Sequence, residues 1–149
     1  MERVFLSQSE AQTEAIGAEI AEGFQGGDVV LLYGELGCGK TALVRGAARV
    51  LGVQEVITSP TYTLIQPYEA DGGLTVYHAD LYRIEEAEEL FEIGFEECLF
   101  AGGIVFVEWP QIAADMLAGL KVQTIRIEKT EDKERRITLI KNGHEDTGS

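Results

Sequence analysis

Gly34-Glu35-Leu36-Gly37-Cys38-Gly39-Lys40-Thr41 is a glycine-rich segment that ends in Gly-Lys-Thr. It fits the P-loop pattern, in which a glycine and four further residues precede Gly-Lys-Thr. The apolar run at 29–33 predicts a buried strand before it, and the spacing of apolar residues at 42–51 predicts a helix after it. Because strand, glycine-rich turn and helix form the context that the motif requires, we expect the segment to bind a nucleoside triphosphate.

The residue types of this segment predict its chemistry. Glycines allow backbone N–H groups to turn towards phosphate oxygens, and the helix N-terminus adds a partial positive charge. Lys40 is predicted to reach the β- and γ-phosphates, and the Thr41 hydroxyl is predicted to ligate Mg²⁺. The residues predicted to contact the nucleotide here are Glu35, Leu36, Gly37, Cys38, Gly39, Lys40, Thr41 and Ala42.

Length and composition predict one globular domain. The chain has 149 residues, of which 45% are hydrophobic and 26% are charged. We expect a single domain over 1–141 and a polar, disordered tail at 142–149. No apolar run is long enough for a membrane span. The two cysteines, Cys38 and Cys98, do not indicate a secreted disulfide scaffold. A cytoplasmic location is therefore expected.

The net charge of −14 is unevenly placed. Residues 1–120 hold five basic and twenty acidic residues, whereas 121–149 hold seven and six. Such a surface repels a phosphate backbone, so we do not expect the chain to bind nucleic acid by itself. Seven glutamates lie within 85–97, where helical spacing predicts one amphipathic helix with an acidic face. That face is either simply solvated or docks a basic partner.

The segment 7–10, Ser-Gln-Ser-Glu, has the spacing of a capping box and predicts the start of a helix. A helix before the P-loop strand commonly lies near the base of the nucleotide. Thr13 or Gln12 is therefore a candidate for contact with adenine, unless this helix serves packing alone.

A cluster of hydroxyl side chains and one proline occupies 58–64. Proline fixes the loop, and the hydroxyls offer ligands to phosphate, Mg²⁺ or water. The segment is either a switch loop that senses the nucleotide or a Ser/Thr-rich turn that enters a strand.

Strands are expected at 64–68 and 74–78, joined as a hairpin around 71–73. They lead into the densest polar cluster of the chain, His-Ala-Asp-Leu-Tyr-Arg at 78–83. Asp80 at the strand end is a candidate to bind Mg²⁺ through water or to orient the attacking water. Arg83 is either a cation for transferred phosphate or a structural ion-pair partner. His78 is interpreted as a hydrogen-bonded strand residue.

The run 103–109 predicts a buried strand that ends in a carboxylate, which is the Walker B arrangement. Glu108 stands where aspartate is more usual, and it is predicted to hold Mg²⁺, directly or through water, beside Thr41. Trp109 is expected to cover apolar surface. The following residues predict a loose helix at 111–120 and two antiparallel edge strands at 122–127 and 135–140.

Together these residues resemble the TsaE (YjeE) family, the small bacterial P-loop ATPases of tRNA threonylcarbamoyladenosine synthesis. The segments that carry the resemblance are the P-loop at 34–41, Ser-Pro-Thr-Tyr-Thr-Leu at 59–64, His-Ala-Asp-Leu-Tyr-Arg at 78–83, Glu-Leu-Phe-Glu-Ile-Gly at 89–94, Val-Glu-Trp at 107–109 and Arg-Arg-Ile-Thr-Leu at 135–139. Cys38 departs from the pattern, because this family usually has a small residue such as alanine there.

The resemblance implies a three-layer α/β P-loop fold with a mostly parallel central sheet and added antiparallel strands. It implies ATP rather than GTP, with Mg²⁺ held by Thr41 and Glu108 and with Asp80 near the γ-phosphate. Thr13 and Arg135 are implied, more weakly, on the adenine side. It also implies two protein partners, TsaD and TsaB, which would carry the tRNA and the threonylcarbamoyl transfer.

Three functions are distinguished at this point. The favoured one is a slow, partner-stimulated ATPase that acts as a switch, with Lys40, Asp80 and Glu108 as its catalytic residues. The second is a small-molecule or nucleotide kinase, although neither an arginine-rich lid nor a second substrate pocket is evident. The third is a binding module whose nucleotide is structural.

Overall fold

The computed structural model of the chain describes residues 2–35, 37–58 and 64–142. Its strands are β1 Glu2–Ser7, β2 Val29–Tyr33, β3 Ile65–Glu69, β4 Thr75–Asp80, β5 Ile104–Glu108, β6 Val122–Lys129 and β7 Arg135–Asn142. Its helices are α1 Glu10–Ala21, α2 Lys40–Leu51, α3 Glu89–Glu92, α4 Phe95–Leu99 and α5 Ala114–Leu117, with 3-10 turns at Asp71–Gly73 and Pro110–Ala113. Within these ranges, no helix is long and apolar enough to cross a bilayer.

All seven strands form one sheet in the order β1-β7-β6-β2-β5-β4-β3. The pairs β6–β2, β2–β5 and β5–β4 are parallel, whereas β1–β7, β7–β6 and β4–β3 are antiparallel. The P-loop strand β2 is therefore central. A mostly parallel sheet with added antiparallel strands is the predicted fold, and it is confirmed.

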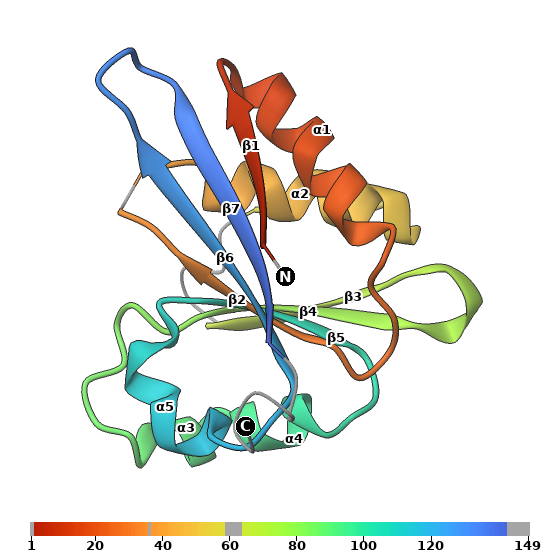
Figure 1. Cartoon of the computed structure of the whole chain (residues 1–149). Helices are drawn as coiled ribbons and strands as arrows, with labels where there is room; N and C mark the ends of the chain where they lie inside the picture. Colours follow the sequence, from red (N-terminus) through yellow and green to blue (C-terminus); the bar gives the residue numbers. More distant parts are fainter. Residues whose placement is uncertain (1, 36, 59–63, 143–149) are drawn as a thin grey trace.

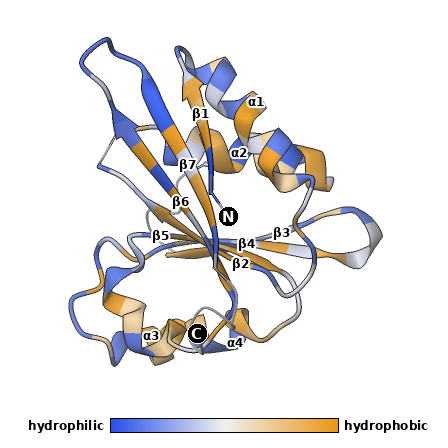
Figure 2. Cartoon of the chain, in the orientation of Figure 1, coloured by the Kyte–Doolittle hydropathy of each residue, from blue (hydrophilic) through white to orange (hydrophobic). Residues whose placement is uncertain are grey.

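Helices cover both faces of the sheet, so the fold has three layers (Figure 1). Alternate residues of β2 serve the two faces, because successive side chains of a strand point to opposite sides. Val30 and Leu32 join the core beneath α1 and α2, and Val29 and Leu31 join the core beneath α3, α4 and α5. Figure 2 shows β2 and β5 as mostly hydrophobic, as expected of strands that are buried on both faces.

Two glycines bring α1 and α2 into close contact. A Cβ at Gly17 would lie 2.2 Å from the Leu43 carbonyl oxygen, and one at Gly46 would lie 1.9 Å from the Glu14 carbonyl oxygen. Any larger side chain would therefore push the helices apart. This contact places Glu14 of α1 directly against the middle of α2.

The sheet has one strand that the sequence did not predict. β1 pairs antiparallel with β7 and occupies the edge, so the prediction that 122–127 and 135–140 lie at the edge was wrong. Val4 and Leu6 of β1 are apolar although they are exposed. The sequence of β1 therefore lacks the alternation of apolar and polar residues that indicates a half-buried strand. The antiparallel pairing of β6 with β7 and the β3–β4 hairpin are both confirmed.

Two helix boundaries also differ from prediction. Ser9, rather than Ser7, is the N-cap of α1, and its Oγ accepts from the Gln12 N–H at 3.1 Å. The single helix expected at 85–97 was wrong, since α3 and α4 are separated at Gly94, which has a φ of 78°. A left-handed residue ends a helix, and glycine adopts this conformation without steric cost.

Candidate nucleotide-binding site

The P-loop joins the end of β2 to the start of α2, at the carboxyl edge of the parallel strands. Gly37 and Gly39 have φ values of 76° and 110°, a region that favours glycine. Gly39 is the N-cap of α2, and among the described residues no side chain caps this helix. Its first-turn N–H groups are therefore available to an anion, and the helix dipole favours one there.

Lys40 is buried and points back over the loop. Its Nζ donates to the Gly34 carbonyl oxygen at 2.7 Å and lies 3.8 Å from the centre of the Trp109 ring. Trp109 holds a left-handed backbone with φ 56° and ψ 57°, and its ring also packs against Tyr82. The ammonium is thus held by a carbonyl and an aromatic face, and among the described residues it forms no ion pair with a carboxylate.

A cavity of about 330 Å³, here called the phosphate-side cavity, opens at the start of α2. It is lined by Glu10, Gly37, Gly39, Lys40, Thr41, Ala42, Arg45, Asp80, Glu108 and Trp109. It brings the three predicted catalytic residues, Lys40, Asp80 and Glu108, to one place. Asp80 and Glu108 are register partners at the ends of β4 and β5, which explains why residues far apart in sequence meet here.

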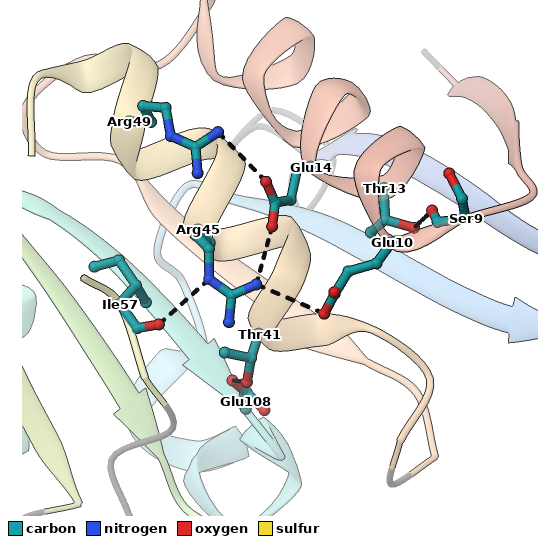
Figure 3. Close-up of polar contacts among 9 residues, drawn as sticks. All are labelled: Ser9, Glu10, Thr13, Glu14, Thr41, Arg45, Arg49, Ile57 and Glu108. Atoms are coloured by element: carbon teal, nitrogen blue, oxygen red, sulfur yellow. Dashed lines mark hydrogen bonds and ion pairs between the residues drawn. The ribbon is translucent and has the colours of Figure 1, made fainter.

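The two residues predicted to hold Mg²⁺ lie within hydrogen-bond distance of each other. The Thr41 hydroxyl donates to Glu108 Oε2 at 3.4 Å (Figure 3). A hydroxyl and a carboxylate are oxygen ligands of the kind that Mg²⁺ takes, together with phosphate oxygens and water. With the uncapped helix start beside them, these side chains fit a magnesium-bound triphosphate.

Glu108 has a buried partner that the sequence did not reveal. His78 Nε2 lies 2.6 Å from Glu108 Oε2, and the His78 side chain is fully buried. The expectation of a hydrogen-bonded strand residue is confirmed. Because a carboxylate oxygen can only accept, Nε2 is the nitrogen that donates, and within the described part of the chain Nδ1 has no hydrogen-bond partner.

Asp80 lies at the same edge in a partly buried setting. Burial raises the pKa of its carboxyl group, the N–H of Tyr82 lowers that pKa by donating to Oδ1 at 3.0 Å, and the charge of Glu108 raises it again. A carboxylate with a raised pKa is a better proton acceptor than an ordinary aspartate.

A second cavity, of about 200 Å³, lies on the other side of the P-loop. Its lining includes Thr13 and Arg135, the two residues predicted on the adenine side. Arg135 Nε donates to the Cys38 carbonyl oxygen at 3.0 Å, and the buried Thr13 hydroxyl lies 2.7 Å from Ser7 Oγ. Gln12 lines neither cavity, and its side chain instead accepts from the Gln8 N–H at 2.6 Å.

Several predicted residues lie elsewhere. Leu36 and 59–63, which contain most of the predicted switch loop, are outside the described residues, and Thr58 is exposed. Arg83 is exposed and does not line the phosphate-side cavity. Cys38 is buried, and burial raises the pKa of its thiol, which favours the inert form over the reactive thiolate.

Comparison with known proteins assigns the family. The family model described as "Threonylcarbamoyl adenosine biosynthesis protein TsaE" matches residues 7–137. The chain belongs to the TsaE family. Its role therefore lies in the biosynthesis of tRNA threonylcarbamoyladenosine.

Individual relatives agree with the TsaE assignment. The TsaE protein of Treponema pallidum is 40% identical over 134 residues, which cover 90% of this chain and 97% of the relative. The TsaE protein of Bacillus subtilis is 37% identical over 133 residues, covering 89% of this chain and 82% of the relative. The crystal structure of Bacillus subtilis YdiB superimposes with a TM-score of 0.81 at 30% identity, covering 99% of this chain and 90% of that one.

Proposed function

We propose that the protein is a magnesium-dependent ATPase that acts as a switch subunit on a TsaD–TsaB partner complex in the cytoplasm. The single observation that carries the proposal is the cavity at the start of α2. It gathers Lys40, Thr41, Asp80 and Glu108 beside an uncapped helix N-terminus. This set combines anion binding, oxygen ligands for a cation and a carboxylate for water, which is what phosphoryl transfer to water requires.

Each side chain has a distinct part in this proposal. The N–H groups of Gly37 to Ala42 bind phosphate oxygens, and Lys40 leaves the Gly34 carbonyl to bind the β- and γ-phosphates. Thr41 and Glu108 would hold Mg²⁺, which supplies charge neutralisation at the phosphates when it is bound. Asp80 accepts a proton from the attacking water or orients it through its carboxylate.

The glutamate-rich segment 85–97 and the exposed aromatic residues near it support binding to a protein partner. Phe91 lies in α3 within the glutamate-rich segment 85–97 and is 60% exposed, and Phe100, directly after α4, is 66% exposed. Exposed aromatic side chains are enriched at protein interfaces. In this proposal the partners bind the tRNA, because the chain itself has a net charge of −14.

The proposal is tested by measuring ATP hydrolysis by the full chain, alone and with purified TsaD and TsaB. We expect slow hydrolysis alone and faster hydrolysis with both partners, with both rates lost in Lys40→Ala. Fast turnover that is insensitive to the partners would contradict the switch. Transfer of phosphate to a metabolite instead of water would indicate a kinase. Intact tRNA modification in Lys40→Ala cells would indicate that the nucleotide is only structural.

A further inference from the structure

Arg45 is a second cation in the phosphate-side cavity, and no predicted function includes it. It lies four residues after Thr41 on α2, and residues at this spacing occupy one face of a helix. Helical side chains lean towards the N-terminus of their helix, so Arg45 leans towards Thr41 and the P-loop. Figure 3 shows its guanidinium above Thr41 and Glu108, and the side chain lines the same cavity as both.

In the part of the chain that the structure describes, the guanidinium is held on two sides and has no partner on the third. Its Nη1 lies 3.0 Å from Glu14 Oε2 and 3.7 Å from Glu10 Oε2, and its Nε donates to the Ile57 carbonyl oxygen at 3.4 Å. Among the described residues, none accepts a hydrogen bond from Nη2. In Figure 3, Nη2 is the nitrogen on the side of Thr41.

The anchor for Arg45 is rigid and stays charged. The close α1–α2 contact at Gly46 fixes the backbone of Glu14. Its side chain, of which only 20% is exposed, is held by Arg45 and Arg49. The hydrogen bond from Arg45 lowers the pKa of Glu14, despite an opposing effect of burial, and the charge of Arg49 lowers it further. A carboxylate held in this way pre-organises the guanidinium, so that little entropy is lost when its free edge binds a ligand.

The charged side chains that line the cavity include more carboxylates than cations, so that a second cation favours the binding of an anion. Its lining includes three carboxylates, Glu10, Asp80 and Glu108, but two cations, Lys40 and Arg45. A triphosphate would add further negative charge beside these carboxylates. Arg49 shares Glu14 with Arg45 but does not line the cavity, so the two arginines differ in access to a ligand there.

We propose that Arg45 binds the terminal phosphate of ATP through its Nη2 edge, with Glu14 as its anchor. The inference rests on the proposed function, since it takes ATP as the ligand. It makes Arg45 a cation supplied by the chain itself at the phosphate that is transferred, and thus a determinant of the preference for ATP over ADP. An arginine that only joins α1 to α2 would not affect this preference.

The test compares dissociation constants for ATP and ADP, both with Mg²⁺, in the full chain and in Arg45→Met. We expect ATP to bind at least tenfold more weakly in the variant, and ADP to change less than threefold, because only ATP carries the terminal phosphate. Arg49→Met is the matched control. It removes a cation from the same carboxylate, and it should leave the ratio of the two constants unchanged.

The outcomes separate the inference from the proposed function. Equal weakening of ATP and ADP in Arg45→Met, no weakening of either, or the same shift in ratio in Arg49→Met would overturn the role of Arg45 alone. Failure of the unaltered chain to bind ATP would overturn the proposed function and the inference with it. If Arg45→Met does not fold, the same two dissociation constants are measured in Arg45→Lys. A single ammonium cannot bind Glu14 and phosphate together as the fork does, so we expect an intermediate loss of ATP preference, and an unchanged ratio would overturn the role.

Discussion

The imidazole Nε2 of His78 lies 2.6 Å from Oε2 of Glu108, and both side chains are buried. The same Oε2 accepts the Thr41 hydroxyl at 3.4 Å. The histidine therefore donates a hydrogen bond to one carboxylate oxygen of Glu108. The Thr41 hydroxyl is near enough to the same carboxylate for both side chains to bind one metal ion. An imidazole behind a metal-binding carboxylate orients the carboxylate and fixes its rotamer.

Replacing His78 by phenylalanine should weaken the response to magnesium. The ring volume is nearly kept, but Glu108 loses its buried N–H donor, and loss of such a partner commonly lowers metal affinity about 10- to 100-fold. We expect the Mg²⁺ concentration for half-maximal nucleotide binding to rise by this order. Tyr77→Phe, at the neighbouring position of β4, is the control. An unchanged Mg²⁺ requirement in a folded His78→Phe protein would show that the contact has no part in metal binding.

Replacing Gly46 by alanine should destabilise the α1–α2 layer. Alanine favours a helix by about 1 kcal/mol over glycine, but its Cβ would lie 1.9 Å from the Glu14 carbonyl oxygen, which is backbone and cannot rotate away. Overpacking of this kind costs typically 1–3 kcal/mol, so we expect a lower urea midpoint. Gly23→Ala is the matched control, because the nearest atoms to its Cβ are at 3.9 Å. Equal midpoints for the two variants would contradict the close helix contact.

Replacing Glu14 by glutamine should remove stability that depends on pH. The pKa of Glu14 is lowered in the folded chain from an ordinary value of 4.5. Its ion pairs therefore stabilise the fold above that value, and this stability is lost as pH falls through the lowered pKa. The free energy of unfolding of the unaltered chain should exceed that of Glu14→Gln at pH 7, and the difference should shrink below about pH 4.5. Glu22→Gln, exposed at the end of α1, should show no such difference. A gap that did not narrow at all as the pH fell from 7 through the acid range would rule out the charge as its cause.

The sequence predicted the parts of the fold that depend on local pattern. The P-loop has a fixed spacing, and Glu108 and Asp80 each end a strand, so the parallel sheet brings them together. Contacts between distant elements were not predictable in the same way. The β4–β5 register pairs His78 with Phe106, so that His78 reaches Glu108 two residues further along β5 on the same face of the sheet. Arg45 meets Glu14 because two glycines let the helices touch. β1 was missed since its partner β7 lies at the far end of the chain.

The single tryptophan should report on Lys40. The Lys40 ammonium lies 3.8 Å from the centre of the Trp109 ring, a contact of about 0.5–2 kcal/mol. A bound triphosphate would draw the ammonium from the ring and from the Gly34 carbonyl oxygen, so we expect ATP with Mg²⁺ to change the tryptophan emission. In Lys40→Met the emission should differ before nucleotide is added and should change little afterwards. Lys121→Met, which removes an exposed lysine other than the one over the ring, should behave as the unaltered chain does. If ATP that is bound by an independent measurement leaves the emission unchanged, Lys40 does not move from Trp109, and its proposed role at the phosphates is wrong.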